Sequence, residues 1–198
     1  MIVHNLDPVL IDLGFLQIRW YSLSYIFGIL IGWWYGKIVL KKQLVESIEK
    51  IYSSKYDDLI TYIIIGVIIG GRLGYILFYN LNFYLDNILE IFKIWKGGMS
   101  FHGGLIGVIL GTLIFSNKNN LNYRVYFDTI SVVAPIGIFL GRISNFINSE
   151  LYGTPTQKPW GIVFPNVDLL KRHPSQIYEA LLEGIVLFII LNFLVFNK

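Results

Sequence analysis

This chain contains five long apolar stretches, which restrict the folds that it can adopt. Each holds roughly 17 to 22 residues, which as a helix rising ~1.5 Å per residue can cross a hydrocarbon core ~30 Å thick, although the third is marginal. We therefore predict an all-α, polytopic integral membrane helix bundle. It forms a single transmembrane domain over residues 1–198, with spans near 20–40, 59–80, 100–116, 126–147 and 176–196.

The composition agrees with a membrane setting and excludes several other classes. The chain is 55% hydrophobic, 16% aromatic and 15% charged, which is far more apolar than a soluble domain of 198 residues requires. Its net charge of +3 comes largely from loop lysines and does not indicate a nucleic-acid partner. With three histidines and no cysteine, the sequence predicts no metal site, no disulfide and no thiol nucleophile of its own. We expect no cofactor.

Glycines recur within the first three spans at a spacing that lets helix backbones approach closely. This pattern predicts packing and says nothing about function. Its members are Gly28, Gly32 and Gly36, then Gly66, Gly70 and Gly74, then Gly104, Gly107 and Gly111. Between the second and third spans, residues 83–95 alternate apolar and polar side chains with a helical period, which predicts an interfacial amphipathic helix.

Basic residues indicate how the chain crosses the membrane. The connection after the first span carries a cluster of lysines, and such an early imbalance usually sets the orientation. Its members are Lys37, Lys41, Lys42, Lys50 and Lys55. We therefore predict that the N-terminus lies outside. Residues 1–19 contain Asp7 and Asp12 and lack a basic n-region, so we expect the first span to act as an uncleaved anchor.

The end of the fourth span contains polar residues that lipid would not tolerate. At helical spacing Arg142, Asn145 and Ser149 fall on one stripe, with Asn148 beside it. An arginine at bilayer depth costs ~2.5 kcal/mol or more, so it should face a partner or a polar cavity. One interpretation is a structural arginine neutralised by Glu150 or by backbone carbonyls. The other is an anion site, because a guanidinium fork suits the phosphodiester of a phospholipid head group.

The other unusual polar residues lie at the same predicted depth as Arg142. With the N-terminus outside, the outer ends of the remaining spans carry Tyr21, Arg72, Tyr75, Tyr79, His102 and residues 172–179. Purely structural polar residues would not need to collect on one side of the membrane. The sequence therefore predicts a single site near the outer leaflet, open to lipid and to the outer aqueous phase.

Four blocks in these segments resemble one known family, the prolipoprotein diacylglyceryl transferases. The likeness extends from about Asp7 to the last span, and four matching blocks in order make it specific, whereas no single block would suffice. The blocks are Gly-Gly-Arg-Leu-Gly-Tyr at 70–75, Ser-Phe-His-Gly-Gly-Leu-Ile-Gly at 100–107, residues 141–153, and Arg-His-Pro-Ser-Gln-Ile-Tyr-Glu-Ala at 172–180.

The resemblance implies a reaction and a set of partners. A diacylglyceryl group passes from phosphatidylglycerol to the lipobox cysteine in the signal peptide of a prolipoprotein, which forms a thioether and releases glycerol phosphate. It also implies a multi-pass protein of the bacterial inner membrane, with an active site that faces the outer leaflet. Its functional residues fall on Tyr21, His102, Arg142, Asn145, Glu150 and Gly153 in this chain.

The chemistry suggests a role for each of these residues. Arg142 is our candidate for the phosphate clamp, because fixed charge in a water-poor site stabilises a departing anion. We expect Asn145, Gly153 and Arg72 to complete the phospholipid-binding set, with Gly153 allowing a close turn or backbone approach. Candidate catalytic residues besides Arg142 are His102, Tyr21 and Glu150.

Alternatives stay open for several of these roles. His102 is either the general base for the thiol or a histidine that only orients its neighbours. Tyr21 and Asn145 would hydrogen-bond the head group, and Glu150 would orient Arg142 or His102. Residues 172–176 either cap the entry of the fifth span or form a wall of the site.

One departure from the family pattern concerns the C-terminus. The family continues with two more helices, the first carrying a Tyr-Gly pair and an essential arginine, whereas this chain stops at Asn197-Lys198. The alternative function is therefore a catalytically impaired membrane protein that keeps the fold and the phospholipid site. A transporter fits less well, because the polar residues gather on one side and no two halves repeat.

Overall fold

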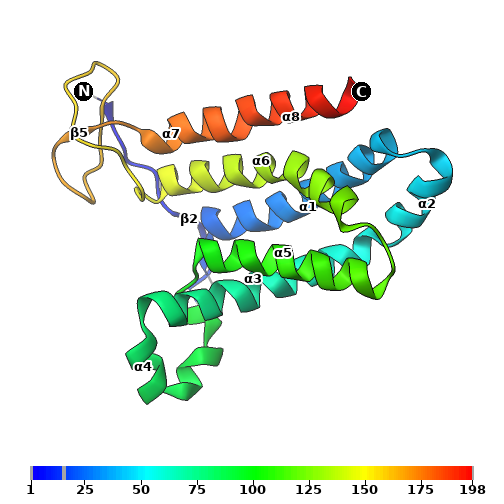
Figure 1. Ribbon diagram of the computed structural model, residues 1–198. Coiled ribbons are helices and arrows are strands. Elements are labelled where there is room, and N and C mark those ends of the chain that lie inside the picture. Colours follow the sequence, from blue (N-terminus) through cyan, green and yellow to red (C-terminus); the bar gives the residue numbers. More distant parts are fainter. Residues whose placement is uncertain (1, 15–16, 198) are drawn as a thin grey trace. The chain divides into compact units, whose positions relative to one another are not determined.

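The computed structural model describes residues 2–14 and 17–197, and most of its regular structure is helical. The long helices are α1 (Trp20–Gln43), α3 (Tyr56–Tyr79), α5 (Phe101–Lys118) and α6 (Tyr123–Ile147). A last helical stretch is built from α7 (Ser175–Glu179), the π-helical segment η3 (Ala180–Val186) and α8 (Leu187–Phe196). All five predicted spans are helices, and the prediction of an all-α polytopic membrane protein is confirmed (Figure 1).

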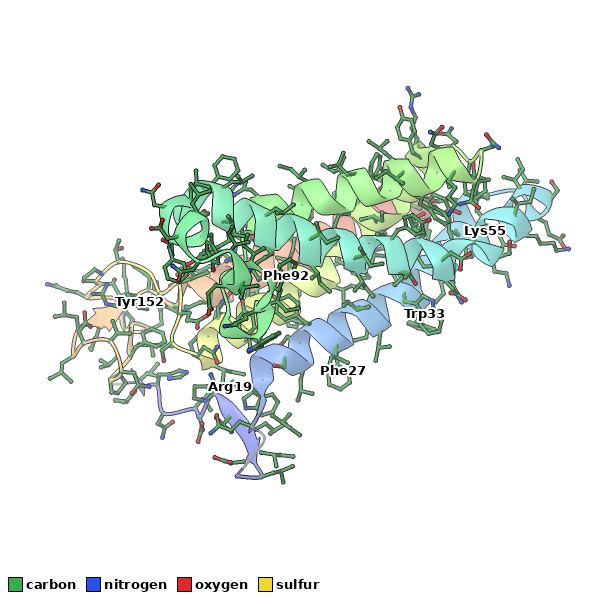
Figure 2. All side chains as sticks on the ribbon, turned by 90° about the horizontal axis from the view of Figure 1, so that it is seen from below. Arg19, Phe27, Trp33, Lys55, Phe92 and Tyr152 are labelled. Atoms are coloured by element: carbon green, nitrogen blue, oxygen red, sulfur yellow. The ribbon has the colours of Figure 1, made fainter. Side chains whose placement is uncertain are left out.

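Four of these helices are long and apolar enough to cross a membrane. They are Trp20–Gln43, Tyr56–Tyr79, Tyr123–Ile147 and Ser175–Phe196. The helix α5 has 18 residues and is not among them, since four glycines and the polar Ser-Asn-Lys end dilute its apolar side chains. The count of five crossings thus stays a prediction. Large apolar side chains such as Phe27, Phe78 and Phe193 point away from the packed interior, as lipid-facing residues do (Figure 2 shows Phe27).

The chain forms two compact units. The first holds the chain up to Gln43 and from Thr129 onward, and the second holds Leu44–Asp128. In the first unit a small sheet pairs β1 (Ile2–Val3) in parallel with β4 (Ile162–Val163), which pairs antiparallel with β5 (Lys171–Arg172). The strands β2 (Val9–Asp12) and β3 (Gln17–Arg19) form an antiparallel hairpin just before α1.

Small residues hold the helices of the first unit together. A Cβ placed on Gly28 would lie 3.5 Å from Gly137 Cα, and one placed on Gly32 would lie 2.8 Å from Val133 Cγ1, so α1 and α6 pack closely along two turns. Farther along α1, Tyr35 donates a hydrogen bond to Asn192 on α8. The expected role of these glycines in packing is therefore confirmed for α1.

In the second unit α3 and α5 lie side by side with their backbones in direct contact (Figure 1). An added Cβ on Gly66 or Gly107 would run into the other residue's carbonyl group, and the same holds for Gly70 and Gly103. A side chain at any of these positions would push the helices apart. The glycine spacing of the second and third spans thus predicted a real helix interface.

The segment between α3 and α5 is helical, but it is not the single amphipathic helix that we predicted over residues 83–95. It consists of α4 (Leu81–Asp86) and two short 3-10 turns, η1 (Ile88–Phe92) and η2 (Ile94–Lys96). Asn87 and Lys93 adopt non-helical backbone angles, which leaves carbonyl groups free to bond elsewhere. These carbonyls point at Arg72 and bind its guanidinium group.

Candidate functional site

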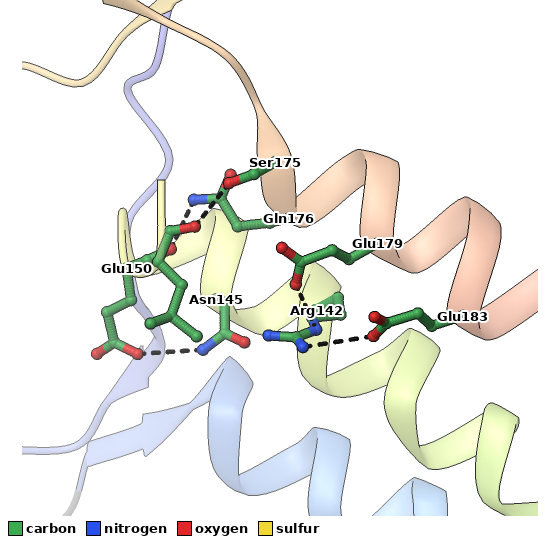
Figure 3. Close-up of polar contacts among 8 residues, drawn as sticks. Arg142, Asn145, Glu150, Ser175, Gln176, Glu179 and Glu183 are labelled. Carbon is green, nitrogen blue, oxygen red and sulfur yellow. Dashed lines mark hydrogen bonds and ion pairs between the residues drawn. The ribbon is translucent and has the colours of Figure 1, made fainter. Parts of the chain in front are cut away.

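Arg142 lies near the C-terminal end of α6, where it faces two carboxylates from the last helical stretch (Figure 3). Its Nε atom is 2.9 Å from Glu179 Oε2, and its Nη2 atom is 3.4 Å from Glu183 Oε2. The Arg142 side chain keeps 28% of its accessible surface. Its remaining nitrogen, Nη1, has no hydrogen-bond acceptor among the residues that the structure describes. Nη1 is therefore a donor that no described residue uses.

Asn145 lies one turn farther along α6 and is almost fully buried. Its Nδ2 atom donates to Glu150 Oε2 at 3.3 Å, while Asn148 donates to the other oxygen at 3.5 Å. The sequence predicted that Glu150 would orient Arg142 or His102. In the structure, the Glu150 carboxylate accepts hydrogen bonds from these two amides. Arg142 is held by two other carboxylates, those of Glu179 and Glu183.

The helix α6 ends at Ile147 in a turn that the start of α7 holds in place. Ser149 and Leu151 adopt left-handed backbone angles, with φ of 57° and 52°. Gln176 Nε2 donates to the Glu150 carbonyl at 2.6 Å, and Ser175 Oγ donates to the Leu151 carbonyl at 2.8 Å (Figure 3). Of residues 172–176, for which capping and wall roles were open, Ser175 and Gln176 do not cap α7 with their side chains and instead secure the backbone that presents Glu150.

His4 braces the same turn from the N-terminal segment. Its Nδ1 atom lies 3.2 Å from Ser149 Oγ, and its ring packs edge-on against Phe146. Burial lowers the pKa of His4, although a backbone hydrogen bond at Phe146 acts in the opposite direction. Burial therefore favours the neutral form of the ring, which packs behind the turn. Nothing in the sequence pattern marked His4 for this position.

Gly153 permits the close backbone approach that we expected of it. An added Cβ would lie 2.7 Å from the carbonyl oxygen of His173, and the Gly153 amide donates to that oxygen at 2.9 Å. Arg172 donates to the Gly153 carbonyl at 3.2 Å and pairs with Asp168. The hydrogen bond from Arg172 holds the pKa of the Asp168 carboxyl below its usual range.

The start of α1 lies at the same end of the first unit as this cluster. Ser24 hydrogen-bonds Ser144, and Ser144 also donates to the Trp20 carbonyl at 3.5 Å. Tyr21 follows Trp20, and its ring packs on Tyr25 with centroids 5.3 Å apart. The first unit thus gathers Tyr21, the Arg142–Gly153 segment and the start of α7 at one end, as the sequence predicted for these segments.

In the second unit His102 and Arg72 also lie at one end of their helix pair. Ser100 accepts a hydrogen bond from the Gly103 amide and so begins α5, which places His102 in its first turn with an exposed side chain. The Ser100 amide donates to the Gly71 carbonyl at 2.9 Å, which ties this turn to the neighbour of Arg72. Arg72 is only 4% exposed.

The guanidinium group of Arg72 is fully engaged by its own loop. It donates to the carbonyls of Ile91, Gly97, Gly98, Glu90 and Lys93 at 2.6 to 3.4 Å, and it lies 5.0 Å from the centre of the Tyr84 ring. A phospholipid phosphate could bind Arg72 only by displacing these carbonyls. The structure therefore places Arg72 as an anchor of the loop before His102, and its role in phospholipid binding stays a prediction.

The sequence did not assign Glu179 and Glu183 as partners of Arg142, although a signal for them was present. The two acidic residues are four positions apart in an otherwise apolar span, which puts them on one face of a helix. Carboxylates at that depth require a cation, and Arg142 was the unpaired cation of the fourth span. Among the described residues no group of three metal-ligating side chains could hold a metal ion.

The cluster around Arg142 contains donors of the kind that bind phosphate esters. The arginine supplies charge and at least one uncommitted nitrogen, and Asn145 supplies an amide whose position is set by Glu150. A shallow hollow lined by Leu6, Asp7, Val9, Leu10, Trp20 and Ile147 lies at the end of α6.

Comparison with known proteins agrees with this chemistry. A sequence profile of the family described as prolipoprotein diacylglyceryl transferase matches residues 8–198. The chain is 50% identical to a protein of Rickettsia typhi over 197 residues, which are 100% of this chain and 74% of the relative. It is 52% identical to one of Nitrobacter hamburgensis over 192 residues, 96% of this chain and 66% of the relative.

A third relative, from Nitratidesulfovibrio vulgaris, is 49% identical over 187 residues, which cover 94% of this chain and 70% of the relative. All three relatives carry the name phosphatidylglycerol–prolipoprotein diacylglyceryl transferase.

Proposed function

This chain belongs to the prolipoprotein diacylglyceryl transferase family, and we propose that it transfers the diacylglyceryl group of phosphatidylglycerol to a prolipoprotein. The acceptor is the thiol of the lipobox cysteine in the signal peptide. The thiolate sulfur forms a bond to the glyceryl carbon, the bond from that carbon to the phosphate oxygen breaks, and glycerol phosphate leaves with the bonding electrons. The product is a thioether, and the thiol proton passes to a base.

The observation that carries this proposal is the partly exposed Arg142 in an apolar protein. The departing phosphate gains negative charge as the carbon–oxygen bond breaks, and a fixed guanidinium group stabilises that charge without reorganising. Glu179 holds Arg142 Nε at 2.9 Å, so one edge of the fork is anchored while Nη1 stays available. A bidentate or single contact from Arg142 to a phosphate oxygen is the interaction that we propose.

The remaining residues have supporting roles in the proposed reaction. Asn145 donates to the head group of phosphatidylglycerol, with its amide set by Glu150 at 3.3 Å. Tyr21 supplies a further donor from the start of α1. His102, exposed in the first turn of α5, accepts the thiol proton, because an imidazole nitrogen can act as a general base.

We also propose where the protein works. Its helices make it a multi-pass membrane protein, and we place it in the bacterial inner membrane with the N-terminus outside. The lysine-rich connection around α2 then lies in the cytoplasm. The end of α6 that bears Arg142 lies on the opposite side, toward the outer leaflet, where the prolipoprotein signal peptide presents its cysteine.

A defined-lipid transfer assay tests the proposed function. The chain is reconstituted in nanodiscs that contain either phosphatidylglycerol or phosphatidylethanolamine, and thioether formation on a lipobox peptide is followed by mass spectrometry. Phosphatidylglycerol has two hydroxyls on an uncharged glycerol head, which Asn145 and Tyr21 can bind, so we expect it to be used at least tenfold faster. A peptide with serine in place of the cysteine is the control. Equal use of both lipids would contradict the proposal.

A further inference from the structure

The two carboxylates that face Arg142 differ in ways that suggest different tasks. Glu179 lies 2.9 Å from Nε, and its side chain is 34% exposed. Glu183 lies 3.4 Å from Nη2, and its side chain is 49% exposed. The contact to Glu179 is thus the shorter and better shielded one. Solvent competes more strongly for Glu183, so this ion pair is the easier of the two to break.

The local charge balance also singles out one of the two carboxylates. One arginine faces two carboxylates, so the cluster carries an excess negative charge before any ligand arrives. A phosphodiester would meet repulsion from both. Binding becomes favourable when one carboxylate turns away and the phosphate oxygen takes its place on the guanidinium fork. Glu183, at the longer distance and with the greater exposure, is the carboxylate that can leave.

The backbone beneath Glu183 is unusual and keeps that residue beside Arg142. Glu183 lies in the π-helical segment η3, and such segments are rare and often found at functional sites. The next residue, Gly184, contacts α6 so closely that an added Cβ would lie 2.7 Å from Phe139 Cβ. Gly184 therefore holds the main chain against Phe139, one turn before Arg142 on α6, and the Glu183 side chain reaches from there to the guanidinium group (Figure 3).

We infer that Glu179 is a positioning residue that fixes the Arg142 fork, and that Glu183 is an exchangeable counter-ion which the ligand phosphate displaces and which returns to expel the phosphate product. The inference rests on the proposed function and deepens it. Glycerol phosphate carries more negative charge than the phosphodiester of the substrate, so it would stay bound to an arginine that had no competing anion. Glu183 supplies that competitor within the same site.

The test compares Glu183→Gln with Glu179→Gln in the full chain in detergent or nanodiscs. Glycerol phosphate is titrated as the soluble probe, and its Kd is measured from the shift in Tm and by calorimetry. We expect Glu183→Gln to tighten this Kd about five- to tenfold and to deepen product inhibition, with little change in the Tm of the free protein. Glu179→Gln is expected to lower kcat about tenfold with a smaller change in KM for phosphatidylglycerol, and Glu179→Asp to recover part of it.

Glu46→Gln is the matched control. It removes the same charge from an exposed ion pair with Lys50 on α2, and it should leave both Kd and kcat unchanged. An unchanged or weaker Kd in Glu183→Gln overturns the inference, as does a Glu179→Gln variant with the parental kcat. The binding arm is independent of turnover. A chain that forms no thioether refutes the proposed function, while the Kd of Glu183→Gln still decides the role of Glu183.

Discussion

At the scale of single residues, the polar side chains at the end of α6 form two neighbouring sets of contacts. Arg142 is bound by Glu179 and Glu183, and Asn145 is bound by Glu150. Each donor in these sets has a defined direction because a carboxylate holds it. A side chain fixed in this way loses little freedom when a ligand binds, so more of the contact energy is available for the reaction.

Replacing Arg142 with lysine tests whether the planar fork matters or only the charge. Arg142→Lys keeps the cation but cannot contact Glu179 and a phosphate oxygen through separate nitrogens of one plane. We expect at least a tenfold loss of thioether formation, roughly 1.4 kcal/mol or more of transition-state stabilisation. Arg124→Lys, at the exposed start of α6, is the control and should keep the parental rate. An Arg142→Lys variant as fast as the parent would show that charge alone suffices.

At the scale of elements, two structural devices shape the second unit. One is Arg72, which gathers the carbonyls of η1, η2 and the following glycines around a single guanidinium group. The other is the close contact of α3 with α5 through glycines. Both lie directly before or along the helix that carries His102. They therefore set where that histidine stands within its own unit.

The role of Arg72 as an anchor predicts a local effect of its replacement. Arg72→Gln leaves several carbonyls of residues 90–98 without their donor, at a cost of about 1–3 kcal/mol. We expect faster amide hydrogen exchange over residues 88–98 and little change in α3 itself, as measured by mass spectrometry of peptic fragments. Arg124→Gln serves as the comparison. Unchanged exchange in this segment would mean that the loop holds its shape without the arginine.

The interface of α3 and α5 predicts a difference between two glycines in the same helix. An added Cβ on Gly107 would run into the Gly66 carbonyl, whereas one on Gly104 would lie 3.9 Å from Val67, an ordinary contact. We expect Gly107→Ala to destabilise the protein by about 1–3 kcal/mol through overpacking. Gly104→Ala should be neutral or slightly stabilising, because alanine favours the helix. Thermal unfolding in detergent measures both. Equal Tm values would contradict the contact.

At the scale of the whole molecule, the proposed orientation can be read directly from chemical labelling. The chain has no cysteine, so single cysteines can be introduced without removing any. Leu169→Cys lies in the connection after α6, where the side chain is 84% exposed, and Lys50→Cys lies on α2. With the N-terminus outside, a membrane-impermeant maleimide should label position 169 in intact spheroplasts and position 50 only after permeabilisation. The opposite pattern would reverse the orientation.

The sequence alone was sufficient for features that depend on local pattern. Apolar length predicted the helices of every span, and glycine spacing predicted that α3 would pack closely on another helix, because both signals come from residues a few positions apart. The sequence also placed Arg142 and Asn145 on one face of α6. It did not predict the short strands or the breaks in residues 81–98, since two-residue strands and 3-10 turns have almost no periodicity of their own.

The tertiary structure decided which ion-pair or hydrogen-bond partner each polar side chain has. Glu179 is 37 positions from Arg142, and the carbonyls bound by Arg72 are 18 to 26 positions away from it. Several acidic residues and many carbonyls were possible partners, and nothing in a local pattern ranks them. The choice follows from helix packing, because the approach of Gly184 to Phe139 brings Glu179 and Glu183 to Arg142 and leaves Glu150 to the amides. A charged side chain in an apolar protein pairs with the oppositely charged or polar group that helix packing places beside it.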